Sequence, residues 1–376
     1  MDSDPFTLGI EEEYLLVDRE SRDLVREAPP GFLASCERRV GSQVGPELMQ
    51  SQVEAGTRVC GSIAEARDEL RRLRRGIGEA AAEHGCAILA GSTHPFACFR
   101  EQQHTARVRY QLLARDLQEV ARRLVVGGMH VHLGIPDPER RIDLMGQASY
   151  ILPHLLALST SSPFWEGRET GLLSYRLAVW DELPRTGLPE PFVSHAEYTR
   201  HLELLVRTGL IEDASQIWWD IRPSARFPTL EMRITDVCTR VDDAICVAAL
   251  FACWVRMLER LRRQNQSWRR YSAMLIGENR WLAQRYGTQR GMLDLGRREL
   301  VPFADLLDEV LLLVAPEAEQ LACAAELRHA RAILARGTSA EQQLRGYRAA
   351  LARGVSPREA LVGVVDWLRE ETLADC

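Results

Sequence analysis

One short run near the N-terminus limits the fold more than any other part of the chain. Residues 9–17 read Gly-Ile-Glu-Glu-Glu-Tyr-Leu-Leu-Val, so three carboxylates interrupt an apolar run. Tyrosine and branched aliphatic side chains favour strands, and the run predicts a β-strand over residues 7–17. Because side chains alternate along a strand, Glu11 and Glu13 share one face, roughly 6.5–7 Å apart, and Glu12 lies on the other.

Two carboxylates this close inside a protein repel each other unless one is protonated or a cation lies between them. A divalent metal is the simplest solution. The alternative is an edge strand whose acidic side chains point into water. A second acidic segment bears on this choice: residues 45–54 alternate at their end and predict another strand, with Gln52 and Glu54 on one face. Glu47 lies at the start of that segment, beside Pro46.

A third segment, residues 124–135, predicts a strand that carries two histidines on one face. His130 and His132 point one way, and the apolar residues between and around them point the other way. Gly127 and Gly128 precede the pair, and bare glycines allow a ligand or another backbone to approach closely. A single histidine here would more often be a packed core residue. Two histidines on one face favour a ligand, because neutral imidazole can bind a metal or donate to phosphate.

A fourth segment, residues 217–236, predicts two strands joined by a turn. Glu231 and Arg233 share a face of the second strand, and an ordinary salt bridge is the simplest interpretation. With Arg222 and Arg226 nearby in sequence, they also form an acid within an arginine cluster. Such a cluster suits a metal–triphosphate site.

The composition excludes several classes of function. All 47 basic residues are arginine, so the chain has no lysine for a P-loop or for Schiff-base chemistry. Phosphate must then be bound by metals and arginines. The net charge of −6, without a basic block, gives no support for nucleic-acid binding. No apolar run has membrane-spanning length and no signal peptide is evident, so we expect no membrane partner and a cytoplasmic location.

The length of 376 residues predicts one large domain over residues 1–376, with a helical C-terminal part from about residue 290. An apolar run over residues 86–90 predicts a buried strand, and residues 161–171 predict a functional loop or lid. Helical periodicity, beginning with a capping box at Ser62, predicts helices over residues 63–80, 110–124, 142–158, 196–207, 241–263, 272–286, 303–314, 316–335, 340–351 and 357–372.

Five motifs occur in order along the chain: Phe6-Thr7-Leu8-Gly9-Ile10-Glu11-Glu12-Glu13-Tyr14, Glu47 with Gln52-Val53-Glu54, Gly128-Met129-His130-Val131-His132, Ser162-Pro163-Phe164-Trp165-Glu166-Gly167, and Leu230-Glu231-Met232-Arg233. Together with Gly337-Thr338 and Asp366-Trp367-Leu368, they make the whole chain resemble the carboxylate–amine ligase family, also called glutamate–cysteine ligase type 2.

The resemblance implies an α+β fold similar to the catalytic half of glutamine synthetase. In that fold a curved antiparallel sheet has helices packed on its outer face, and here C-terminal helices would be added. Two or three Mg²⁺ or Mn²⁺ ions bridge the ATP phosphates to the acyl substrate in the broader fold. Oxygen ligands with one imidazole suit these ions better than zinc.

Carried over position by position, the resemblance implies specific roles. The implied metal ligands are Glu11, Glu13, Glu47, Glu54, His130 and Glu231. His132 would lie near the ATP phosphates, and the charge of the transferring phosphoryl group would be neutralised by Arg222, Arg226 and Arg233. Acceptor-side loops would bind a carboxylate through residues around His94, Arg109 and Ser174 to Arg176.

The reaction implied by the resemblance is ATP-dependent joining of a carboxylate to an amine through an acyl phosphate. The expected acid is L-glutamate, through its γ-carboxylate, with cysteine or another amine as acceptor. Two other classes stay open: a metal-dependent hydrolase that activates water, and a non-catalytic small-molecule binding protein on the same fold. The expected partners are small molecules, and a homodimer stays open.

Overall fold

The computed structural model describes residues 6–374 and 376, and its central element is an antiparallel sheet. Seven strands form it among the described residues: β1 (Leu8–Asp18), β2 (Val44–Pro46), β3 (Gln52–Gly56), β4 (Cys86–Leu89), β5 (Met129–Gly134), β8 (Ile221–Pro223) and β9 (Thr229–Met232). The main order is β2-β3-β1-β5-β9-β8, and β4 pairs with the second half of β1. The long strand β1 therefore lies at the centre of the fold.

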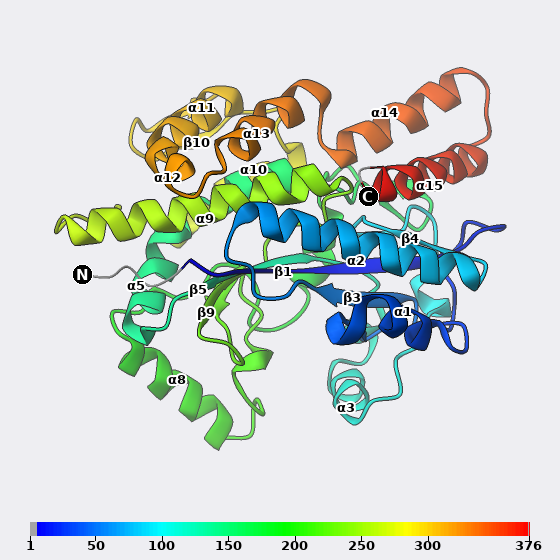
Figure 1. Ribbon diagram of the computed structural model, residues 1–376, viewed down its shortest axis with the longest axis horizontal. Helices are drawn as coiled ribbons and strands as arrows, with labels where there is room; N and C mark the ends of the chain where they lie inside the picture. Colours follow the sequence, from blue (N-terminus) through cyan, green and yellow to red (C-terminus); the bar gives the residue numbers. More distant parts are fainter. Residues whose placement is uncertain (1–5, 375) are drawn as a thin grey trace.

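The two faces of β1 have different surroundings. Leu8, Ile10, Tyr14 and Leu16 are buried, whereas Glu11 and Glu13 on the opposite face are partly exposed. The buried face packs against helices, as Figure 1 shows for the two long helices that lie across the sheet. The helices on this face are α1 (Phe32–Val40), α2 (Ile63–Glu83), α5 (Pro138–Ala148) and α9 (Val241–Arg263), and the two long ones are α2 and α9. The predicted class, an antiparallel sheet with helices on one face, is confirmed.

The middle carboxylate of the acidic run points into this core. Glu12 pairs with Arg74 of α2: Nη2 lies 2.6 Å from Oε1, and Nε lies 2.9 Å from Oε2. Both side chains are 0 % exposed. The Tyr14 hydroxyl donates to Glu12 at 2.7 Å, and Arg74 also donates to the carbonyls of Cys238 and Thr239. This buried pair ties β1 to α2 and to the segment that enters α9.

Several predicted single helices are in fact broken. The predicted helix over residues 110–124 is divided into α3 (Val108–Leu117) and α4 (Glu119–Arg122), because Gln118 takes a φ of 51°. The predicted helix 142–158 is α5 followed by α6 (Leu152–Ser159), with Pro153 in the first turn of α6. The predicted helix 316–335 is α12 (Ala315–Gln320) and α13 (Ala324–Arg336), separated by Ala322 at a φ of 50°. Helix propensity does not reveal such left-handed residues.

Residues 45–54 form two strands rather than one. β2 ends at Pro46 and β3 begins at Gln52, so Glu47 lies in the connection between them. The sequence also did not predict α1 or the hairpin of β10 (Met292–Asp294) and β11 (Glu299–Val301). Predicted elements that occur close to their expected positions include β4, the start of α2 at the Ser62 cap, and all of α9.

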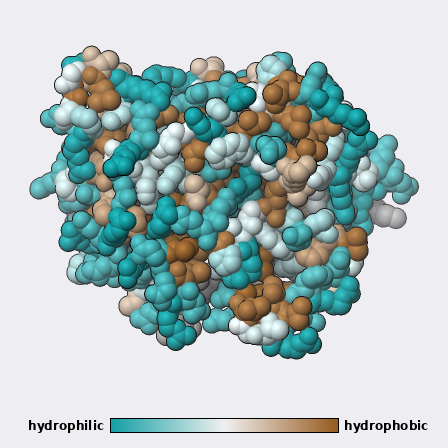
Figure 2. All heavy atoms as spheres, turned by 180° about the vertical axis from the view of Figure 1, so that it is seen from behind, coloured by the Kyte–Doolittle hydropathy of each residue, from teal (hydrophilic) through white to brown (hydrophobic). Residues whose placement is uncertain are grey.

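From α11 onward the described chain is helical, and in Figure 1 α11, α12 and α13 lie above α9, whereas α14 and α15 lie beyond its end. The helical part thus begins later than the predicted residue 290, after the hairpin of β10 and β11. The remaining elements are β6 (Phe164–Trp165), β7 (Arg168–Glu169), α7 (Tyr175–Trp180), α8 (His195–Arg207), α10 (Ala273–Tyr286), α11 (Phe303–Leu313), α14 (Ser339–Ala352) and α15 (Pro357–Leu373). Across residues 6–374, no helix has both the length and the apolar character needed to span a bilayer. Seen from the side opposite to that of Figure 1, the surface is largely hydrophilic with separate apolar patches (Figure 2).

Candidate active site

Five neighbouring strands, β3, β1, β5, β9 and β8, bring the predicted site residues onto the face of the sheet opposite to α2 and α9. Residues paired directly across antiparallel strands share a face. The pairs are Glu13 with Glu54, Glu11 with His130, His132 with Glu231, and Glu231 with Arg222. Strand register thus assembles side chains that are far apart in the sequence.

Glu11 lies between the two histidines. Its Oε2 is 3.2 Å from His130 Nδ1, and its Oε1 is 3.4 Å from His132 Nε2. Burial opposes ionisation of Glu11, but the hydrogen bonds to both rings outweigh it and hold the pKa well below its usual range. For His130, burial and the neighbouring charge of Arg233 lower the pKa, which favours the neutral ring. A neutral imidazole beside an ionised carboxylate is a metal-binding combination.

A second group consists of Glu13, Glu47 and Glu54. One carboxylate oxygen from each lies within 4.8 Å of the others. Glu13 accepts a hydrogen bond from the backbone of Gly128 at 2.8 Å, and Glu47 accepts one from the backbone of Leu48 at 2.5 Å. Burial, with the charge of Glu13 next, raises the pKa of Glu47 to about 7. Burial and the charge of Glu47 likewise raise the pKa of Glu54. Three acidic groups share one small volume at the cost of mutual repulsion.

The glycines before the histidine pair have a structural reason. A Cβ on Gly127 would lie 2.8 Å from the carbonyl oxygen of Glu13. A Cβ on Gly128 would lie 2.4 Å from the Arg176 guanidinium. These glycines therefore let the site strand approach β1 and a buried arginine, as the sequence predicted for another backbone or a ligand.

The donor set fits hard divalent cations. The atoms of Glu11, Glu54 and His130 form one group within 4.8 Å, and those of Glu13, Glu47 and Glu54 form another. Glu54 belongs to both groups, so it would be a ligand whichever group holds a divalent ion. Oxygen ligands with a single imidazole match Mg²⁺ or Mn²⁺.

Glu231 has different neighbours. Both of its oxygens accept from Arg222, at 3.1 Å each, and Oε1 also accepts from Arg233 Nη1. Burial opposes ionisation, but the charges of Arg233 and Arg222 hold the pKa of Glu231 well below its usual range. Glu231 lies outside both carboxylate groups described above, so its role as a metal ligand stays a prediction.

The three predicted arginines are placed differently. Arg233 Nη1 also lies 3.3 Å from His130 Nδ1, and its buried Nε has no hydrogen-bond partner among the described residues. Arg222 is buried against Glu231 and donates to the carbonyls of Ser215 and Ile217. Arg226 is exposed on the turn of residues 224–228. Of these three arginines, Arg233 is thus the one that contacts His130 and also has a buried donor without a partner among the described residues.

His132 and the predicted acceptor-side residues have identifiable contacts. His132 Nδ1 lies 3.0 Å from the hydroxyl of Thr229. Both nitrogens of His94 contact backbone groups, of Arg22 on one side and of Phe96 and Ala97 on the other. His94 thus has no ring nitrogen left for a substrate. The side chain of Arg109 lies outside the described residues.

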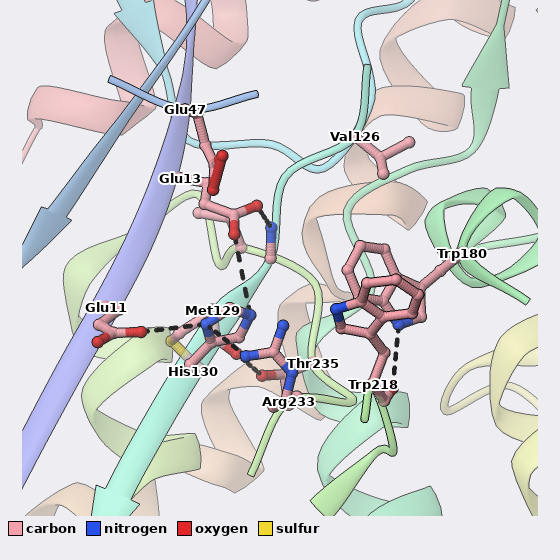
Figure 3. A network of polar contacts seen from close by, with 12 residues as sticks. Glu11, Glu13, Glu47, Val126, Met129, His130, Trp180, Trp218, Arg233 and Thr235 are labelled. Atoms are coloured by element: carbon pink, nitrogen blue, oxygen red, sulfur yellow. Dashed lines mark hydrogen bonds and ion pairs between the residues drawn. The ribbon is translucent and has the colours of Figure 1, made fainter. Parts of the chain in front are cut away.

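Ser174 and Arg176 are buried and contact other protein groups. The Ser174 hydroxyl donates to Asp236 at 2.8 Å, and Arg176 donates to the carbonyls of Arg233 and Ile234. Sequence reasoning missed Trp180, whose ring centroid lies 5.8 Å from the guanidinium carbon of Arg233 (Figure 3). Nothing local in the sequence indicates it, because this contact joins distant segments.

The fold is similar to solved ligases. A bifunctional glutathione synthetase from Pasteurella multocida superposes with a TM-score of 0.69 at 15% identity, covering 98% of this chain and 53% of that chain. A glutamate–cysteine ligase from Francisella tularensis superposes with a TM-score of 0.65 at 14% identity, covering 100% of this chain and 90% of that chain. At these identities the likeness establishes the fold.

Sequence similarity is much higher to two other proteins, both provisionally named glutamate–cysteine ligase 2. One, from Rhodospirillum rubrum, is 59% identical over 373 residues, covering 98% of this chain and 96% of that protein. The other, from a Jannaschia species, is 52% identical over 370 residues, covering 98% and 97%. The protein is therefore an enzyme of the class that forms carbon–nitrogen bonds. The model of glutamate–cysteine ligase family 2 matches residues 7–362, and the chain belongs to that family.

Proposed function

We propose that the enzyme uses ATP to convert a carboxylate, the γ-carboxylate of L-glutamate, into an acyl phosphate that an amine then attacks, with cysteine as the expected amine. Family membership supports the ligase class. The observation that carries the mechanism is the joint presence of four carboxylates, His130 and the free Nε of Arg233 in one site. The Francisella tularensis relative was solved with AMP, which is consistent with nucleotide use.

The chemistry requires charge neutralisation. A divalent cation held by Glu11, Glu54 and His130, or by Glu13, Glu47 and Glu54, would screen the negative charge of the polyphosphate. Arg233 is anchored through Nη1 to Glu231, and its free Nε can donate to an oxygen of the transferring phosphoryl group. Arg222 keeps Glu231 ionised and in place. His132 would add a donor near the same phosphates.

The proposed reaction has two steps. An oxygen of the γ-carboxylate attacks the γ-phosphorus, and ADP leaves with the electrons of the broken P–O bond. The amine nitrogen then attacks the acyl carbon, phosphate leaves, and the nitrogen loses a proton. The role of Glu231 as a metal ligand and the role of Arg226 as a phosphate contact stay predictions. The homodimer and the cytoplasmic location also stay predictions.

An isotope experiment tests this route. With glutamate labelled by ¹⁸O in its γ-carboxylate, we expect ADP as the nucleotide product and one label in the released phosphate. The reason is that the attacking oxygen stays on phosphorus when the amine displaces it. Mass spectrometry of phosphate, with cysteine and a panel of amines, measures the label. Label recovered in AMP would overturn the acyl phosphate, and phosphate labelled only from solvent would indicate a hydrolase.

Metal binding should stabilise the fold, because Glu11, Glu13 and their acidic neighbours repel each other without a cation. At roughly ten times its Kd, Mg²⁺ or Mn²⁺ should add about 1.4 kcal/mol to the free energy of unfolding. Calorimetry with and without metal measures this. A Glu11→Gln/Glu13→Gln variant should lose the effect, whereas a Glu27→Gln/Glu37→Gln variant, changed at exposed positions, should keep it. An equal shift in all three proteins would contradict the metal assignment.

A further inference from the structure

Two arginines lie against one indole ring at the edge of the site. The guanidinium carbons of Arg176 and Arg233 are 5.6 and 5.8 Å from the ring centroid of Trp180. The two arginines are 2 % and 8 % exposed, respectively. Figure 3 shows the indole of Trp180 next to Arg233, together with Trp218. Two buried like charges repel each other, and the electron-rich ring face attracts both.

Arg176 is fixed by its own contacts. It donates to the carbonyl of Arg233 at 3.1 Å and to that of Ile234 at 3.2 Å. Its guanidinium lies so close to Gly128 that a Cβ there would clash with it. Its backbone N–H donates to Ser162, whose hydroxyl donates to Asp236. These contacts therefore hold the positive charge of Arg176 close to Arg233.

Arg233 is held on one side only. Its Nη1 contacts Glu231 and His130, but its buried Nε is without a partner among the described residues. The indole of Trp180 is itself anchored, because its Nε1 donates to the carbonyl of Trp218 at 3.3 Å. It also packs against two clusters of buried apolar side chains, one that includes Leu177 and Met232 and one that includes Val179 and Leu183. The ring is thus a fixed surface beside an arginine that is otherwise held through one nitrogen.

We propose that Trp180 is a positioning residue for phosphoryl transfer: its ring face offsets the repulsion between Arg176 and Arg233 and keeps the Arg233 Nε–H available to the transferring group. This inference rests on the proposed role of Arg233. An arginine–tryptophan contact of this kind contributes enough to change a rate by roughly tenfold when the ring is removed. The effect should be on kcat rather than on substrate KM, because it acts through a group used in the transition state.

The test compares three variants. Trp180→Leu should lower kcat about tenfold with KM nearly unchanged, whereas Trp180→Phe, which keeps an aromatic face, should stay within about threefold of wild type. Trp218→Leu is the matched control, because it removes a neighbouring indole whose cationic partner is Arg185 rather than Arg233. Circular dichroism melting establishes that each variant is folded. If the Leu variant does not fold, Trp180→Met replaces it, because an unbranched side chain fills the space more easily.

A double-mutant cycle separates positioning from general packing. In an Arg233→Lys background, Trp180→Leu should cost little further activity, because its effect acts through Arg233. Equal losses in both backgrounds, or a Leu variant as active as wild type, would overturn the inference.

A readout independent of turnover separates this inference from the proposed function. The ¹⁵Nε–H resonance of Arg233, assigned by its absence in Arg233→Lys, should shift when the ring is lost in Trp180→Leu and persist in Trp180→Phe. A resonance unchanged in the Leu variant would overturn the inference. A wild-type protein that releases no ADP would instead overturn the proposed function.

Discussion

Replacing Arg233 with lysine should lower kcat by a factor of about 10²–10³ while the fold stays intact. Arg233 uses Nη1 to contact Glu231 and leaves Nε free, so one planar group has two separate directions of donation. Lysine keeps the positive charge, and with it the ion pair, but a single ammonium cannot make both contacts in the same geometry. We therefore expect loss of transition-state stabilisation without loss of stability.

The rate of ADP release measures this effect, and thermal melting checks the fold. Arg75→Lys is a suitable control, because Arg75 is exposed on α2 and distant in sequence from the site strands. It should leave both kcat and melting unchanged. If Arg233→Lys turned over at the wild-type rate, Arg233 would be only a structural partner of Glu231.

The second large effect concerns stability. Arg74→Met should cost roughly 3–5 kcal/mol of unfolding free energy, because it leaves the Glu12 carboxylate buried without its cation. The same change at exposed Arg75, the next residue of α2, should stay within about 0.5 kcal/mol of wild type. Urea unfolding followed by circular dichroism gives both values.

A compensating change completes this experiment. Glu12→Leu combined with Arg74→Met removes both charges, and much of the lost stability should return, because neither partner is then left unpaired. If Arg74→Met alone unfolded like wild type, the buried pair would contribute little to the fold.

The period of two along each strand predicted which side chains share a face. Glu11 and Glu13 lie together, Glu12 lies on the other side, and His130 and His132 face the same way, as the alternation requires. The resemblance to a ligase family supplied the antiparallel sheet and its helices, because motif order along a whole chain reflects a common fold.

The local sequence pattern did not predict which distant segments contact each other. Glu47 reaches the carboxylate group only because β2 ends at Pro46 and the chain turns before β3. Arg226 shares a short segment with Arg222, yet it lies exposed on a turn. The placement of Trp180 beside Arg233 depends on how α7 packs, and neither propensity nor periodicity encodes that packing.

The alternation of β1 also bears on how this chain can evolve. Removing or adding one residue within the strand would exchange its two faces. Glu12 would then enter the site, and the residues beside it would be driven against the apolar helices, so that both stability and the site would fail in one event. Substitutions can accumulate in β1 one at a time, but insertions and deletions cannot. Changes in chain length should therefore occur in the surface connections, where no face is specified.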